Sequence, residues 1–358
     1  MKRIMCFALV AMLMTACSND EEIMQPPIAE SGVVTFQIST DSGLNPLTKG
    51  NIYSQDSAHQ VTRIALYMFN NTTGANYVYH SKKDVVWAPG VKDQRFPVQL
   101  LPGKYKCIAV GRTASDLYTF AELGVGLSSE TAISAIIANS EDVSDIFSAN
   151  KDFTVAPLAQ CVPITLKRSV AGIMGYFKNI PATIGGKEVA YICLKISGSN
   201  KKINLHDRTG GTSSSSSYNL INIALSGQTK TPDGYYTGNT IPKIVKLPNT
   251  QLGGNYIIPV GPCTMNLELQ DAAHTIIKSW NVINLSGTTQ LNFAANDFYS
   301  LGKKLRPDCT EGGTPGAGTP EDNDFAVDLS SIDQCINLNI ESAWNPMLNI
   351  GIKPSTTP

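Results

Sequence analysis

The sequence has few charged residues and no excess of either sign. Charged side chains make up 16% of its 358 residues, and 28 Lys and Arg stand against 29 Asp and Glu. Proteins that bind nucleic acid normally carry a basic domain or stripe, so the charge balance argues against that partner. The hydrophobic share of 42% is enough for one large or two medium cores, which argues against a mostly disordered chain.

Motifs of common catalytic and metal sites are also missing. The sequence has no GxSxG, P-loop or HExxH pattern, no GxGxxG before a helix, and no Cys with a His close to it. The four His are scattered, which disfavours a zinc site or a His-rich centre. Glu141, Asp142 and Asp145 lack the further oxygen ligands of a calcium loop and are interpreted as solvated surface. We therefore expect no enzyme, no cofactor and no metal.

Long apolar runs are absent except for one at the start of the chain. Ile4–Met14 follows the basic pair Lys2 and Arg3 and leads to small residues, which predicts a signal peptide over residues 1–16. The run is too short for a spanning helix, so no transmembrane helix is expected. The residues from Leu13 to Ala16, followed by Cys17, resemble the bacterial lipobox, in which the Cys becomes the lipidated N-terminus.

An acidic stretch with two prolines follows Cys17. Residues 17–30 predict a lipidated tether that lifts a domain from the membrane. Its first part, Ser18–Glu22, resembles export signals of gram-negative lipoproteins that reach the outer face of the outer membrane. Several acyl chains on one residue hold a protein far better than one chain does. We therefore expect a surface-exposed outer-membrane lipoprotein that carries palmitate or similar chains.

Beyond the tether, apolar and polar residues alternate with a period of two, as in half-buried β-strands. Residues 95–101 and 105–110, on either side of Pro102 and Gly103, predict a hairpin. Met265–Leu269 and Ile276–Val282 predict a second hairpin. Residues 128–137 place isoleucines at helical spacing behind Ser128, Ser129 and Glu130, which predicts a short helix.

These patterns predict a mainly β protein with two antiparallel β-sandwich domains, over residues 31–162 and 163–310, and one or two short helices. Residues 311–324 are rich in Gly and Pro and predict a linker. Residues 325–358 are expected to hold C-terminal strands that fold back onto the body.

Six cysteines follow Cys17, and they allow 15 pairings. Cys107, Cys193 and Cys263 lie in apolar, strand-like runs and are expected to be small buried thiols. Cys309 and Cys335 flank the loop-rich segment, which makes them the candidate disulfide.

The order of several segments along the chain resembles that of a known family. The segments are the lipobox at Cys17, the strands Val33–Thr40 and Thr62–Asn70, the turn Leu101–Tyr105, the run Ile164–Ala171, the segment Asn296–Gly302, and Ile336–Ile340 with Trp344. In this order they resemble the fimbrillin and the fimbrial anchor or tip subunits of type V fimbriae of gram-negative anaerobes. The resemblance implies two transthyretin-like β-sandwiches, exported as a lipoprotein and built into a surface pilus.

The resemblance also implies a mode of assembly. In this family, shaft and tip precursors are cut by a trypsin-like protease after the first strand, and the vacated groove accepts a neighbour's strand. Lys49 and Gly50 are the matching site here, where the family more typically has Arg. An anchor subunit would keep its lipid and first strand, whereas a tip or shaft subunit would lose both. The candidate donor strand comprises Ile336, Leu338, Ile340, Leu348, Ile350 and Ile352.

A second function is compatible with the same export signal. A surface glycan- or nutrient-binding lipoprotein would present exposed aromatic side chains, and Trp87, Tyr235 and Tyr236 are the candidates. Burial in the core is the more common fate of Trp residues, including Trp280 and Trp344. For the fimbrial function, the expected partners are other fimbrial subunits, the outer membrane, and a ligand on a host or bacterial surface.

Overall fold

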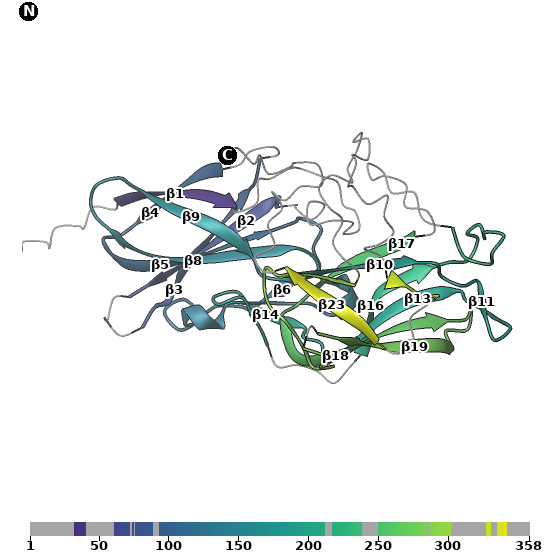
Figure 1. Ribbon diagram of the computed structural model, residues 1–358. Helices are drawn as coiled ribbons and strands as arrows, with labels where there is room; N and C mark the ends of the chain where they lie inside the picture. Colours follow the sequence, from purple (N-terminus) through teal and green to yellow (C-terminus); the bar gives the residue numbers. More distant parts are fainter. Residues whose placement is uncertain are drawn as a thin grey trace, which may run out of the picture.

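The computed structural model describes residues 32–40, 61–71, 74, 76–88, 93–211, 217–237, 250–284, 286–301, 327–330 and 335–341. The fold is mainly β, as predicted, and two sandwiches lie end to end in an elongated molecule (Figure 1). The domain boundaries stay predictions. Strand β9 (Gln160–Arg168) spans the expected boundary between residues 162 and 163.

The first sheet has seven strands in the order β3-β2-β5-β8-β9-β1-β4. Their bounds are β1 (Gly32–Thr40), β2 (Arg63–Asn70), β3 (Val78–Val86), β4 (Asp93–Leu100), β5 (Gly103–Arg112) and β8 (Ile146–Val155), with β9 as above. β8 and β9 pair only at Phe147–Ser148 with Lys167–Arg168, so the sheet folds over there. Apolar side chains of β1, β2, β5 and β9 form the core between its two faces.

The predicted hairpin around Pro102 is wrong. β4 pairs with β1, whereas β5 pairs with β2 and β8. Leu101 and Pro102 therefore carry the chain from one face of the sandwich to the other. A Pro–Gly turn suits both connections, so the turn residues alone do not reveal the partner of each strand.

The helix predicted over residues 128–137 is also wrong. A three-residue 3-10 helix, η2 (Glu130–Ala132), precedes strand β7 (Ser134–Ile136), and a second one, η3 (Ser140–Asp142), follows it. Ile133, Ala135 and Ile137 are buried while Ile136 is 41% exposed, which is the alternation of a strand. Isoleucines four residues apart fit either a helix or one face of a strand.

β7 belongs to a small sheet that joins the two halves of the chain. Its order is β15-β14-β7-β6, with β6 (Thr119–Phe120), β14 (Lys202–Asn204) and β15 (Thr209–Gly210). Apolar residues of β7 and β14 pack with Ala65, Tyr67 and Phe69 of β2 in one core cluster. Both faces of β2 are therefore buried.

The second sandwich is built from a sheet in the order β16-β13-β18-β19-β23-β21-β10-β17. The strands are β10 (Ala171–Lys178), β13 (Tyr191–Ser197), β16 (Ser217–Ala224), β17 (Thr250–Ile257), β18 (Val260–Gln270), β19 (Ile276–Ile283), β21 (Phe298–Leu301) and β23 (Cys335–Glu341). β20 (Leu291–Phe293) pairs with β18, and β22 (Val327–Asp328) pairs with β10. The predicted hairpin of β18 and β19 is confirmed.

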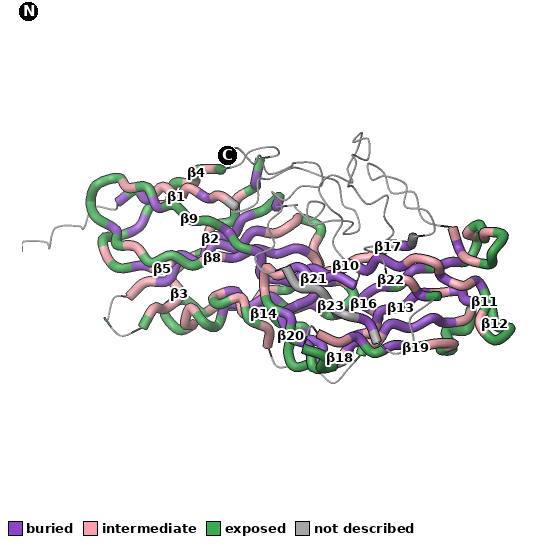
Figure 2. The backbone as a smooth tube through the Cα atoms, in the orientation of Figure 1, coloured by how far each residue is buried: buried purple, intermediate pink, exposed green. Residues whose placement is uncertain are grey.

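Buried residues concentrate in the central strands of both sandwiches, whereas β3, β4 and the connections are mostly intermediate or exposed (Figure 2). A short hairpin of β11 (Thr183–Ile184) and β12 (Lys187–Glu188) lies at one end of the molecule, and the link between β8 and β9 lies at the other (Figure 1). The two ends are therefore formed by exposed loops of different sandwiches.

Candidate functional site

Strand β1 lies in the interior of the first sheet. It pairs antiparallel with β4 over Gly32–Ser39 and parallel with β9 over Val34–Thr40. Both of its edges are thus hydrogen-bonded to neighbours along almost the whole strand. Loss of β1 would separate β4 from β9 and open a groove in this face of the sandwich.

The two faces of β1 differ in character. Val34, Phe36 and Ile38 are fully buried, and the Phe36 ring meets the Phe153 ring edge-on at a centroid distance of 5.3 Å. On the other face, Gln37 Nε2 donates to Asp93 Oδ2 at 3.1 Å. The position of β1 between β4 and β9 therefore fits a strand with apolar side chains at every second residue.

Strand β23 is seated differently. Its first part, Cys335–Asn337, pairs parallel with β19, and its second part, Leu338–Glu341, pairs antiparallel with β21. Since β19 and β21 belong to opposite faces of the second sandwich, β23 closes one side of it. Ile336 is buried in the core beside Val282, its partner on β19.

A short segment before β23 fastens the C-terminal part to the body. β22 pairs with the end of β10, and Leu329 is buried in the core. Asp328 accepts hydrogen bonds from Asn179 Nδ2 at 2.7 Å and from the backbone N and Oγ of Ser330 at 3.0 and 2.6 Å. Burial opposes the ionisation of Asp328, but the bonds from Ser330 and Asn179 outweigh it and lower its pKa.

A buried ion pair lies where the chain passes from one sandwich to the other. Arg168, the last residue of β9, is buried and donates from Nε and Nη2 to Asp145 Oδ1 and Oδ2 at 2.7 and 3.0 Å. Tyr256 on β17 donates its hydroxyl to Asp145 at 3.4 Å. Burial raises the pKa of Asp145, and the Arg168 guanidinium acts against that rise. The interpretation of Asp145 as solvated surface is therefore wrong.

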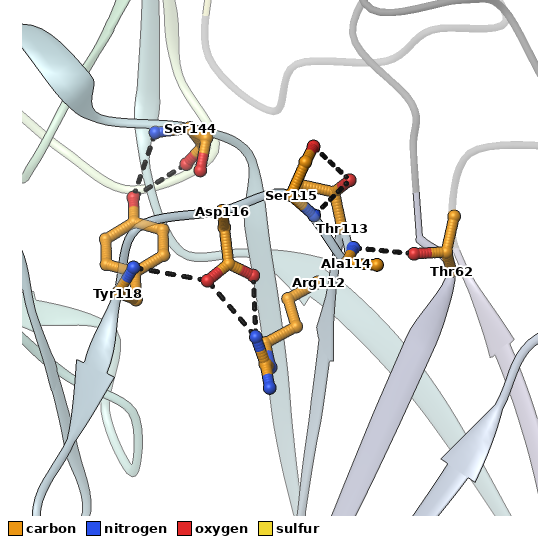
Figure 3. Close-up of polar contacts among 8 residues, drawn as sticks. All are labelled: Thr62, Arg112, Thr113, Ala114, Ser115, Asp116, Tyr118 and Ser144. Atoms are coloured by element: carbon orange, nitrogen blue, oxygen red, sulfur yellow. Dashed lines mark hydrogen bonds and ion pairs between the residues drawn. The ribbon is translucent and has the colours of Figure 1, made fainter.

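A second polar cluster fixes the loop after β5 (Figure 3). Arg112 Nη1 contacts both carboxylate oxygens of Asp116 at 3.1 and 2.9 Å, and Asp116 accepts from the backbone N of Tyr118. The Tyr118 hydroxyl donates to the carbonyl of Ser144 at 2.7 Å, and burial raises the pKa of Tyr118. These contacts hold the loop against the residue before Asp145. They support the join between the sandwiches rather than a reaction.

In the part of the chain that the structure describes, the cysteines and the metal-binding residue types are not arranged as a catalytic or metal site. Cys107, Cys193 and Cys263 are free and buried, as predicted, and burial raises the pKa of Cys193 to about 11 and of Cys263 to about 12. Cys161 is free and exposed. Within the same residues, no group of three or more His, Cys, Asp and Glu could hold a metal, and no helix has the length and apolarity to cross a membrane.

The aromatic residues proposed for ligand stacking are mostly inside. Trp87 and Tyr236 are buried in the cores of the first and second sandwiches, as is Trp280. The Tyr236 hydroxyl donates to the carbonyl of Val189, whereas Tyr235 is half-buried. A cavity of about 480 Å³ lies between β15 and the adjoining ends of β18 and β20, with Asn200 and Arg208 in its lining. Because Trp87 and Tyr236 are buried, their rings are not available to stack on a sugar.

Several predicted site residues lie outside the described part of the chain. These are Cys17, Lys49, Gly50, Cys309, Trp344, Leu348, Ile350 and Ile352, together with the side chains of Cys335, Leu338 and Ile340. The backbone of the last three belongs to β23. Their roles in lipidation, cleavage, disulfide formation and donation stay predictions.

The ion pair at the join was not predicted, although the sequence contains a signal for it. Val162, Ile164 and Leu166 point inward from β9, and Arg168 continues the same period of two. An arginine in register with buried residues needs an acidic partner, since an unpaired buried charge is costly. Asp328 gave no such signal, because its partner Asn179 is distant in the sequence.

Comparison with known proteins adds a family and a set of similar folds. A family model described as "Fimbrillin-A associated anchor proteins Mfa1 and Mfa2" matches residues 30–300. The fold is similar to the fimbrial anchor protein Mfa2 from Porphyromonas gingivalis, with 12% identity, a TM-score of 0.43, and coverage of 76% of this chain and 89% of that chain. The fold is also similar to the tip fimbrial protein Mfa3 with C-terminal truncation, from the same organism. Here the identity is 13%, the TM-score is 0.40, and the match covers 78% of this chain and 97% of that chain. No curated protein matches the sequence.

Proposed function

The chain belongs to the family of fimbrillin-A associated anchor proteins, and from this premise we propose that it holds a type V fimbria on the outer membrane. In this function Cys17 carries the lipid, the residues before β1 form the tether, and β1 stays in its sheet. Other fimbrial subunits join by β-strand addition. The role is structural and adhesive, without catalysis.

The match to a family of anchor proteins over residues 30–300 carries the proposal, and the pairing of β1 defines what an anchor would have to keep. The strand has neighbours on both sides, and its three inward side chains are fully buried. A protein that keeps this strand keeps the covalent path from Cys17 to the folded body. A chain cut at Lys49 would lose both the strand and the lipid, so retention of β1 and retention of the anchor are one event.

For the contact with the next subunit we propose the C-terminal strand as the donor. β23 shares only part of its length with each neighbour, so its release breaks fewer backbone hydrogen bonds than the release of β1. The donor would run from Ile336, Leu338 and Ile340 to Leu348, Ile350 and Ile352. A disulfide between Cys309 and Cys335 would limit how far this segment reaches. The vacated edges of β19 and β21 would be open to a partner's strand.

The test of the anchor function is intact mass and N-terminal analysis of the protein recovered from outer membranes, with and without a trypsin-like protease. The expected product is a chain with acylated Cys17 that keeps β1 after protease treatment. A mature chain that starts at Gly50 would overturn the proposal, because that product belongs to a subunit that gives up its first strand.

The donor role is tested by assembly with the other subunits. Deletion of residues 325–358 should abolish copolymerisation while the body stays folded. Because Ile336 belongs to the core, a milder variant, Ile350→Asp with Ile352→Asp, tests donation without touching β23. Thr356→Asp with Thr357→Asp is its control and should assemble normally. Normal assembly of the Ile350 and Ile352 variant and of the deletion would remove the donor role.

A further inference from the structure

At one end of the first sandwich, two apolar, exposed connections lie beside the polar residue Asn71, whose backbone N donates to the carbonyl of Lys104. Leu101 and Pro102 link β4 to β5, and residues 156–159, with the sequence Ala-Pro-Leu-Ala, link β8 to β9. Leu101 is 55% exposed and Leu158 is 79% exposed. Neither connection contains a charged residue. We call these two connections the apolar end.

The apolar end surrounds the point where the chain enters the fold. Gly32, the first residue of β1, is paired with Leu100, and Gly103 is paired with Val155. A Cβ atom on Gly32 would lie 2.4 Å from the carbonyl oxygen of Ala156, so the start of β1 lies directly against the second connection. The arc between β8 and β9 is the outermost part of this end, and its residues are exposed (Figures 1 and 2).

The opposite end of the molecule has a different chemistry. There the β11–β12 hairpin carries Lys187 and Glu188, and Lys230 forms an ion pair with Glu188 at 2.6 Å. Both partners of this pair are solvent-exposed. The molecule therefore has a charged hairpin at the end of the second sandwich and two uncharged connections at the end of the first.

We propose that the apolar end lies against the lipid surface of the membrane that holds the acylated chain. This inference rests on the proposed anchor function. Residues 18–31 separate Cys17 from β1, and fourteen residues reach at most about 50 Å even when fully extended. The tether thus keeps the apolar end near the bilayer, where Leu101 and Leu158 can bury apolar surface at the interface.

The residue next to the apolar end fits the same surface. Lys104 follows Gly103 on β5 and is exposed. A lysine in this position can place its alkyl stem over the apolar end and its ammonium group at the phosphates of lipid headgroups. This contact would give the attached protein a fixed orientation on the membrane. β23 belongs to the other sandwich, so the orientation would present the C-terminal strand away from the membrane (Figure 1).

The test uses the full-length acylated protein in vesicles of phosphatidylethanolamine and phosphatidylglycerol. An environment-sensitive dye is attached through Leu158→Cys in a Cys161→Ser background, and brominated lipids serve as quenchers. Leu117→Cys in the same background is the matched control, because Leu117 is 62% exposed in the loop beyond the other end of β5. The background protein gives the contribution of the remaining cysteines. Quenching at position 158 should exceed that at position 117 by about threefold or more.

Equal, weak quenching at the two positions would overturn the inference, and so would shielding of position 158 only after a second fimbrial subunit is added.

A second measurement separates this inference from the anchor function. The non-acylated Cys17→Ala full-length chain should still pellet weakly with the same vesicles. Leu101→Ser with Leu158→Ser should reduce that binding by about tenfold, whereas Leu117→Ser should not. Absence of lipid on native Cys17 would defeat the anchor function, while an unchanged binding of the double variant would defeat only the apolar end.

Discussion

β1 and β23 lie in different sandwiches and are built into their sheets in different ways. β1 has two neighbours along almost its whole length and three fully buried side chains. β23 has one neighbour for its first part and another for its second part. A strand paired like β1 is part of the frame, by which we mean the hydrogen-bonded sheet without which the sandwich does not form. A strand paired like β23 closes a frame that other strands have already formed. Exchange between subunits is therefore easier to reconcile with β23.

The largest expected effect comes from the core face of β1. Phe36→Ala should lower the free energy of unfolding by about 3–5 kcal/mol, because it leaves a cavity between β1 and the ring of Phe153. Chemical denaturation followed by circular dichroism measures the loss. Val33→Ala, on the exposed face of the same strand, should cost about 0.5 kcal/mol or less. A loss at Phe36 as small as that at Val33 would contradict the assignment of β1 to the frame.

The ion pair at the end of β9 should come next. β9 is the parallel neighbour of β1, and Arg168→Met leaves Asp145 buried without its cation. We expect a loss of about 3 kcal/mol in the free energy of unfolding. The double variant Arg168→Met with Asp145→Leu removes both charges and should be more stable than the single variant. A double variant with the summed loss of both single changes would show that the pair itself contributes nothing.

The corresponding test on β23 is Ile336→Ala. Because the body already has its frame, the loss should be about 2 kcal/mol, near the lower end for a buried isoleucine. Hydrogen exchange should show faster opening of residues 335–341 with little change at β1. Ile276→Ala, on the half-exposed Ile276 of β19, is the control and should change neither. Equal acceleration at β1 and β23 would mean that the two strands open as one unit.

The alternation of side chains was enough to predict both strands and the β18–β19 hairpin, because adjacent residues of a half-buried strand are alternately apolar and polar. Partner choice was not predictable in the same way. The parallel pairing of β1 with β9 and the divided pairing of β23 join residues far apart in the sequence. The link at Pro102 and the strand at Ser134–Ile136 were misassigned because their local patterns fit two structures equally well. Arg168 was predictable in principle from its place in the period of β9.

The smallest expected effect concerns the fastening of the segment before β23. Asp328→Asn keeps the shape of the side chain but removes the charge that Asn179 and Ser330 stabilise. The loss should be about 0.5–1 kcal/mol at pH 6, since the site is partly exposed to solvent. The pKa of Asp328 is lowered in the folded protein, so its contribution is complete above the ordinary Asp value of about 3.9 and disappears as the pH falls through the lowered value. Denaturation curves of the natural protein and the variant should therefore differ at pH 6 and converge in more acidic solution. A difference that persists unchanged there would assign the effect to the shape of the side chain rather than to its charge.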